Sequence, residues 1–130
     1  LEANSLVLEE LQASIASDTE IDSHSEIDSR VTVESGAKII NSTIRGPCII
    51  GENAVIENSY IGPFTSIYHH VTVQNCEIER SIVLEHSTLC DLDGRLQDSL
   101  IGRHAKVIKA DSKPRTLKMN LGDHSSVSLI

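Results

Sequence analysis

The sequence predicts an all-β protein, a parallel β-helix of about six triangular coils preceded by a short helix. Aliphatic residues recur at a step of six, and sometimes five, along nearly the whole chain. A small residue stands two positions before almost every one of them. Aromatic residues make up only 2% of the 130 residues, so the interior must be thin and filled by aliphatic side chains rather than rings.

Residues 1–12 are expected to form a linking or capping helix. Leu1, Leu8 and Leu11 fall roughly on one helical face, with glutamates on the other. The end of a β-helix exposes unpaired strand edges, which favour aggregation. We therefore expect this helix to cover the first open coil.

Residues 13–130 are expected to form the β-helix itself. Residues two apart on a strand point to the same side, so each six-residue unit offers one small and one aliphatic inward side chain. A helix would need apolar spacings of three and four instead. The aliphatic series is Ile15, Ile21, Ile27, Val33, Ile39, Ile44, Ile50, Ile56, Ile61, Ile67, Val73, Ile78, Val83, Leu89, Leu96, Ile101, Val107, Leu121 and Val127.

Three such units make one triangular coil, and we name them the first, second and third sides, counting from Ile15. Ile39, Ile56 and Val73 stand 17 residues apart, which places them on the same side of successive coils. The irregular steps follow the second side, so one corner absorbs most of the length variation. The longest of them is a loop excursion at about residues 108–120.

Composition excludes several classes of function. A net charge of −8 argues against nucleic-acid binding, and no apolar run approaches the ~20 residues of a membrane span. The first residues have neither the basic nor the apolar stretch of a signal peptide. Three cysteines without a close pair fit a reducing compartment, so we expect a cytoplasmic protein. Cys48 and Cys76 occupy inward places and should be inert, whereas Cys90 should face outward.

Several stretches resemble known families. An aliphatic residue followed by glycine is typical of the left-handed β-helix of hexapeptide-repeat proteins, and this resemblance supplies the expected hand. The pattern occurs at Ile50–Gly51, Ile61–Gly62, Ile101–Gly102 and Leu121–Gly122. Longer stretches resemble long-form glucose-1-phosphate thymidylyltransferases, namely Leu1–Asn4, Leu6–Leu8, Gly46–Asn53, Ser59–Ile67, Ser81–Glu85, Asp98–Arg103 and Leu121–Ser125.

The second resemblance implies that the chain is a C-terminal assembly or regulatory domain. The nucleotidyltransferase domain before it would use Mg²⁺ to convert dTTP and glucose 1-phosphate into dTDP-glucose and pyrophosphate. The seven glycines form no G-x-G loop that could cradle phosphates, so the chain should not catalyse this reaction alone. We expect no catalytic residue, cofactor or metal in it. We expect it to contact the nucleotidyltransferase domain and to form a homo-oligomer, trimer before dimer.

A coenzyme A-dependent acyltransferase acting on an amino sugar is the alternative. Acyltransferases of this fold use a histidine to deprotonate the acceptor, and a histidine titrates near neutral pH. His69 is the preferred candidate because its side chain should point outward, and His70 is the second. Lys113 and Arg115, in the excursion, would then help to hold coenzyme A.

The other histidines follow the repeat. His24, His70, His86, His104 and His124 all stand at the fourth place after an aliphatic residue, where Gly36 and Asn53 also stand. Such residues tolerate a positive φ, which favours a role in corner turns.

The first side also favours a ladder of exposed side chains. Asn53, His70, His86 and His104 follow one another there at a spacing of ~4.8 Å. Such a ladder could bind a metal or respond to pH, but no carboxylate or cysteine completes a set of zinc ligands. A zinc enzyme similar to γ-carbonic anhydrase needs three converging histidines, and their spacing does not indicate that set.

Overall fold

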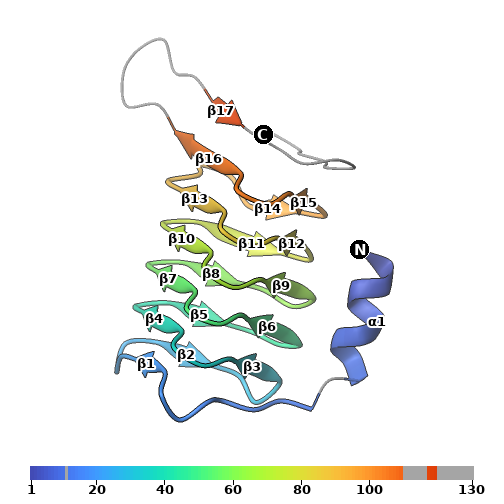
Figure 1. Ribbon diagram of the computed structural model, residues 1–130, viewed down its shortest axis with the longest axis vertical. Coiled ribbons are helices and arrows are strands. Elements are labelled where there is room, and N and C mark those ends of the chain that lie inside the picture. Colours follow the sequence, from blue (N-terminus) through green and yellow to red (C-terminus); the bar gives the residue numbers. More distant parts are fainter. Residues whose placement is uncertain (11, 110–116, 120–130) are drawn as a thin grey trace.

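Short strands wind into a solenoid in the computed structural model, which describes residues 1–10, 12–109 and 117–119 (Figure 1). The solenoid has about five coils, and the helix α1 (Glu2–Glu10) lies beside it. Strands of successive coils pair in parallel, which confirms the predicted all-β parallel solenoid. No helix among the described residues is long and apolar enough to cross a membrane.

Three sheets form the sides, and each collects every third strand. The first side contains β3 (Val31–Val33), β6 (Cys48–Ile50), β9 (Thr65–Ile67), β12 (Ile82–Val83) and β15 (Leu100–Ile101). The second contains β1 (Glu20–Ile21), β4 (Lys38–Ile40), β7 (Val55–Glu57), β10 (Thr72–Gln74), β13 (Thr88–Cys90), β16 (Lys106–Lys109) and β17 (Leu117–Met119). The third contains β2 (Glu26–Ile27), β5 (Thr43–Ile44), β8 (Tyr60–Ile61), β11 (Glu77–Glu79) and β14 (Leu96–Gln97).

Inward aliphatic side chains stack in columns along the solenoid. On the second side Ile39 pairs with Ile56, and Ile56 pairs with Val73, so the predicted interval of one coil is confirmed. All three are fully buried. Burying one such side chain stabilises a protein by about 1.5–3 kcal/mol. The thin interior, which has no aromatic rings, is therefore stabilised by the same aliphatic contact repeated in each coil.

Serine hydroxyls join neighbouring coils at the small inward places. Ser59 Oγ accepts a hydrogen bond from the N–H of Cys76, at 3.1 Å, and donates one to the carbonyl of Glu57, at 2.8 Å. The N–H of Ser59 donates in turn to Ser42 Oγ in the preceding coil, at 3.1 Å. The spacing indicated only a small residue here, whereas the structure shows that the hydroxyl satisfies a buried backbone N–H.

The predicted position of the helix is wrong. Ile15 and Ile21 at the first end are 51% and 36% exposed, so α1 does not cover this coil. Residues 14–16 pair with Val33 there instead, through two backbone hydrogen bonds. The helix runs along the first side, as Figure 1 shows, and contacts β9.

Two polar contacts and one apolar side chain hold α1 in this position. The side chain of Asn4 donates to the carbonyl of Phe64, at 3.3 Å, and accepts from Ser66 Oγ, at 2.6 Å. Leu8 is 3% exposed, but Leu1 is 41% exposed, and Leu11 lies outside the described residues. The expected apolar face is therefore reduced to Leu8 among the residues described.

The last coils depart from the regular pattern. β17 pairs with β16 antiparallel, with Ile108 opposite Lys118, so the chain reverses direction within the predicted excursion. The sixth predicted coil depended on Leu121 and Val127, which lie outside the described residues. About five coils are therefore described rather than six.

Candidate functional site

One corner of the solenoid carries a row of exposed imidazoles, which we call the histidine corner: His69, His70, His86 and His104. They follow β9, β12 and β15, where the first side turns into the second. His70, His86 and His104 have φ values of 56°, 61° and 54°. These residues therefore occupy left-handed turn positions, as the repeat predicted.

For the two other histidines at the fourth place of the repeat, the expected positive φ is not observed. His24 is absent from the residues with positive φ in the part of the chain that the structure describes, so its turn is of another kind. His124 lies outside the described residues. Asn53 has a φ of 56° one coil before His70, and its Nδ2 lies 3.5 Å from His70 Nε2.

The imidazoles form the expected ladder. The ring centroids of His70 and His86 lie 4.9 Å apart with planes 13° from parallel. Those of His86 and His104 lie 5.0 Å apart with planes 3° from parallel. The rings therefore stack at the spacing between coils.

His69 joins this ladder, which the sequence analysis missed. Its ring stands edge-on to those of His70 and His86, at 5.3 and 5.2 Å between centroids. Its Nδ1 lies 3.0 Å from His70 Nδ1. The side chain is exposed, as expected, but it leans along the corner rather than away from it. The only signal in the sequence was that His69 directly precedes a ladder residue.

Electrostatics keep the middle of the ladder neutral. Partial removal from water by its neighbours lowers the pKa of His86, and repulsion from the adjacent imidazoles lowers it further. A backbone hydrogen bond lowers the pKa of Glu85, aided by the positive charge of Arg103. The Arg103 Nε lies 3.2 Å from a Glu85 carboxylate oxygen.

A cavity of about 480 Å³ opens between α1 and the first side, and His69 lies at its edge. It is lined by Asn4, Val7, Leu8, Glu34, Ile49, Glu52, Ser66, Ile67, Tyr68 and His69. This is the described space nearest to the acyltransferase candidates His69 and His70. Lys113 and Arg115, the candidates for holding coenzyme A, lie outside the described residues.

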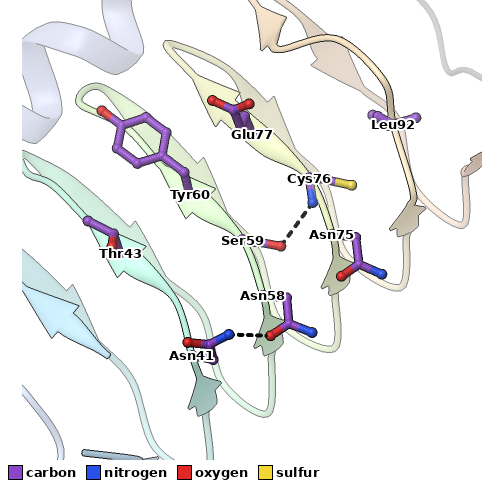
Figure 2. Close-up of a pocket in the computed structure, with 9 residues that line it drawn as sticks. All are labelled: Asn41, Thr43, Asn58, Ser59, Tyr60, Asn75, Cys76, Glu77 and Leu92. Atoms are coloured by element: carbon purple, nitrogen blue, oxygen red, sulfur yellow. Dashed lines mark hydrogen bonds between the residues drawn. The ribbon is translucent and has the colours of Figure 1, made fainter. Parts of the chain in front are cut away.

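The corner between the second and third sides carries three carboxamides and one carboxylate instead, and we call it the asparagine corner: Asn41, Asn58, Asn75 and Asp91. All four have φ between 45° and 57°. Figure 2 shows the first three lining a shallow pocket of about 420 Å³. Asn41 Nδ2 donates to Asn58 Oδ1 and Asn75 Nδ2 donates to Asp91 Oδ1, both at 2.7 Å. Side chains of this corner therefore bond to one another in pairs between coils.

The cysteines offer little nucleophilic character. All three are free, and Cys48 and Cys76 are buried, as predicted. Burial raises the pKa of the Cys48 thiol to about 12 and that of Cys76 to about 11. Cys90 is half-buried rather than fully outward, and burial raises its pKa as well. Thiolates are therefore scarce at neutral pH.

Comparisons with known proteins give a clear relationship. No family model matches the chain. It is 40% identical over 129 residues to a glucose-1-phosphate thymidylyltransferase from Streptomyces griseus, and equally identical to one from Streptomyces antibioticus. The chain is homologous to the C-terminal part of glucose-1-phosphate thymidylyltransferases. The matches cover 99% of this chain but only 36% and 35% of these thymidylyltransferases, so it spans about a third of their length.

Two further matches are weaker than those to the thymidylyltransferases. A low-salt glycan biosynthesis nucleotidyltransferase from Haloferax volcanii is 34% identical over 72 residues, which are 55% of this chain and 20% of that protein. A crystal structure of a hexapeptide transferase family protein from Anaplasma phagocytophilum covers 86% of this chain and 80% of its own, at 17% identity. The TM-score of this match is 0.33.

Proposed function

We propose that this chain is the assembly module of a sugar-1-phosphate nucleotidyltransferase and is not catalytic by itself. The observation that carries this proposal is its 40% identity to two thymidylyltransferases over 99% of its own length but about a third of theirs. In the whole protein, a catalytic domain would convert dTTP and glucose 1-phosphate into dTDP-glucose and pyrophosphate with Mg²⁺. The solenoid would hold several such domains together.

Exposed apolar side chains on α1 support a homo-oligomer. Leu6 and Val7, which are neighbours on α1, are 61% and 64% exposed, and association with another copy would remove both from water. They lie on the helix that packs along the first side, so two copies could bury them by pairing their helices or by seating them on a neighbouring side. As from the sequence, we expect a trimer before a dimer.

Light scattering tests the assembly. We expect the chain at micromolar concentration to run as a multiple of its 14.2 kDa mass. Replacing Leu6 and Val7 together by serine should shift it to a smaller species, whereas Glu9→Ala, also exposed on α1, should not. A single 14.2 kDa species for the unmodified chain contradicts the proposal.

A coupled assay for pyrophosphate tests whether the chain is catalytic without a nucleotidyltransferase domain. The chain supplied with dTTP, glucose 1-phosphate and Mg²⁺ should release none. The same chain fused behind a thymidylyltransferase catalytic domain should give an active oligomer. Activity of the isolated chain would overturn the proposal.

We also place the protein in the cytoplasm. Its three cysteines are free, and two are buried where no partner thiol could reach them without unfolding. Such thiols suit a reducing compartment.

The acyltransferase alternative has less support. The Nδ1 atoms of His69 and His70 lie within hydrogen-bond distance of each other, so neither is free to act as a base. The sequence relatives are nucleotidyltransferases. Calorimetry with acetyl-coenzyme A at millimolar concentration should therefore show no binding.

A further inference from the structure

We propose that His69, His70 and His86 form a binding site for one divalent transition-metal ion, with Cu²⁺ and Ni²⁺ preferred. One ring nitrogen of each residue lies within 4.8 Å of those of the other two. All three side chains are exposed, so an ion can enter from solvent. The proposal is independent of the assembly role.

The distance between His69 and His70 decides the geometry. Their Nδ1 atoms lie 3.0 Å apart. Two nitrogens at that separation, each ~2.0–2.1 Å from one ion, subtend about 91–97° at the metal. This angle is close to the 90° between neighbouring ligands of a tetragonal or octahedral ion and smaller than the tetrahedral angle. The separation of the pair therefore suits Cu²⁺ or Ni²⁺ once the proton between the two Nδ1 atoms has moved to Nε2, and Zn²⁺ only after the pair also opens.

His86 supplies the third nitrogen from the next coil. Its ring nitrogen lies within 4.8 Å of a ring nitrogen of each partner, and two ligands of one ion lie at most about 4.2 Å apart, so the rings close up when an ion binds. Exposed imidazoles rotate freely enough for that.

The backbone already holds the two coils in place for this set. The N–H of His86 donates to the carbonyl of His69, at 3.2 Å. Positive φ at His70 and His86 fixes the direction in which both side chains leave the corner. The backbone of the site is therefore ordered before an ion binds, and only the side-chain torsions remain to be fixed.

The surrounding charge also favours a cation. The Glu85 side chain directly precedes His86 in the chain, although Arg103 is paired with it at 3.2 Å. The chain as a whole carries a net charge of −8. An ion bound here would link the turn after β9 to the turn after β12 in the next coil, in addition to the backbone hydrogen bonds between the coils.

Calorimetric titration of the chain with Ni²⁺, and separately with Cu²⁺, tests the site. We expect one ion per chain, with Cu²⁺ binding more tightly, and no binding of Mg²⁺, which prefers oxygen ligands. His70→Asn and His86→Asn keep a residue that tolerates positive φ, as Asn53 does one coil earlier. Each should weaken Ni²⁺ binding by about tenfold or more, since one arm of a chelate is lost.

Matched controls separate a built site from the general affinity of exposed histidines. His24→Asn removes an exposed histidine of the same repeat place near the other end, and should change the affinity by less than about twofold. His104→Asn removes the end of the stack and should change it little. Substoichiometric Cu²⁺ should broaden the imidazole NMR signals of His69, His70 and His86 before that of His24.

Three results would overturn the proposal. One is the absence of saturable Ni²⁺ and Cu²⁺ binding. Another is equal weakening by His24→Asn and His70→Asn. A stoichiometry of half an ion per chain would also contradict it, because the ion would then lie between copies. Circular dichroism of each variant checks that the solenoid is intact.

Discussion

The histidine corner and the asparagine corner share the same backbone conformation but differ in the contacts that their side chains make. Both place a residue with positive φ in each successive coil. The carboxamides of Asn41 and Asn58 then bond to each other at 2.7 Å, because an amide carries both a donor and an acceptor. The rings of His70 and His86 stack instead, at 4.9 Å, and keep ring nitrogens at the surface. One corner is therefore satisfied by its own side chains, and the other remains able to bind.

Gly51→Ala should destabilise the histidine corner most. A Cβ at Gly51 would lie 2.6 Å from the carbonyl carbon of Tyr68 and 2.7 Å from the N of His69, both backbone atoms. We expect a loss of about 2–3 kcal/mol, because the next coil must move.

Gly62→Ala is the matched control for Gly51→Ala. Its Cβ would lie 2.9 Å from Cγ of Glu79 and 3.1 Å from the ring of Tyr60, which are side-chain rather than backbone atoms, so it should cost less than Gly51→Ala. Urea unfolding of the two variants measures the difference. Equal losses would mean that the close backbone approach at Gly51 is unimportant.

Ser59→Ala should come next, beside the asparagine corner. It leaves the buried N–H of Cys76 without its acceptor, at an expected loss of about 1–3 kcal/mol. Ser59→Cys should lose less, since Cys76 itself shows that a thiol fits this row and can donate, from its Sγ to the carbonyl of Gln74. The unfolding midpoints of both variants should therefore rank cysteine above alanine, and the reverse order would contradict the role of the hydroxyl.

Glycine substitutions compare the two corners directly. Asn58→Gly keeps the positive φ but loses the bond with Asn41, so we expect a loss of about 0.5–1.5 kcal/mol. His86→Gly also keeps the φ and removes only a stacked ring, so we expect a change within about 0.5 kcal/mol. Thermal or urea unfolding measures both. A larger loss for His86→Gly would show that stacking holds its corner together.

The smallest effect concerns pH at Asp22, where the asparagine corner begins. The Ser25 hydroxyl, at 2.6 Å, and the N–H of Asn41 lower the pKa of Asp22 below its ordinary 3.8. A lowered folded-state pKa contributes stability above the unfolded-state pKa, and this contribution is lost as the pH falls through the folded-state value. The urea midpoint should therefore fall as the pH is lowered through and below 3.8, and Asp22→Asn should flatten that fall. If the urea midpoint of the variant falls with pH as steeply as that of the unmodified chain, Asp22 does not contribute to the acid sensitivity.

The sequence predicted the repeating part of the molecule well, because a period is visible without knowing any contact. The assignment of Ile39, Ile56 and Val73 to one side follows from their spacing and is confirmed. Positive φ at His70 and His86 was likewise predicted from their place in the repeat and is confirmed.

Contacts that break the period could not be predicted in this way. The position of α1 depends on Asn4 meeting Ser66, which lies 62 residues later, and no local pattern indicates that pair. His69 joined the ladder because its ring turns toward His70 and His86, and a choice of rotamer leaves no trace in spacing. At the first coil, residues 14–16 pair with Val33 as a partial strand, in the place where the helix was expected.

The columns of inward residues also bear on how such chains change in evolution. Each coil pairs only with the coils directly before and after it, and Ile39, Ile56 and Val73 are interchangeable steps of one column. A duplication or deletion that spans one whole coil therefore restores every pairing, whereas one that spans part of a coil turns the inward side chains toward water. Lineages of this protein should differ in length by whole coils, and shorter insertions should gather at the corner that follows the second side.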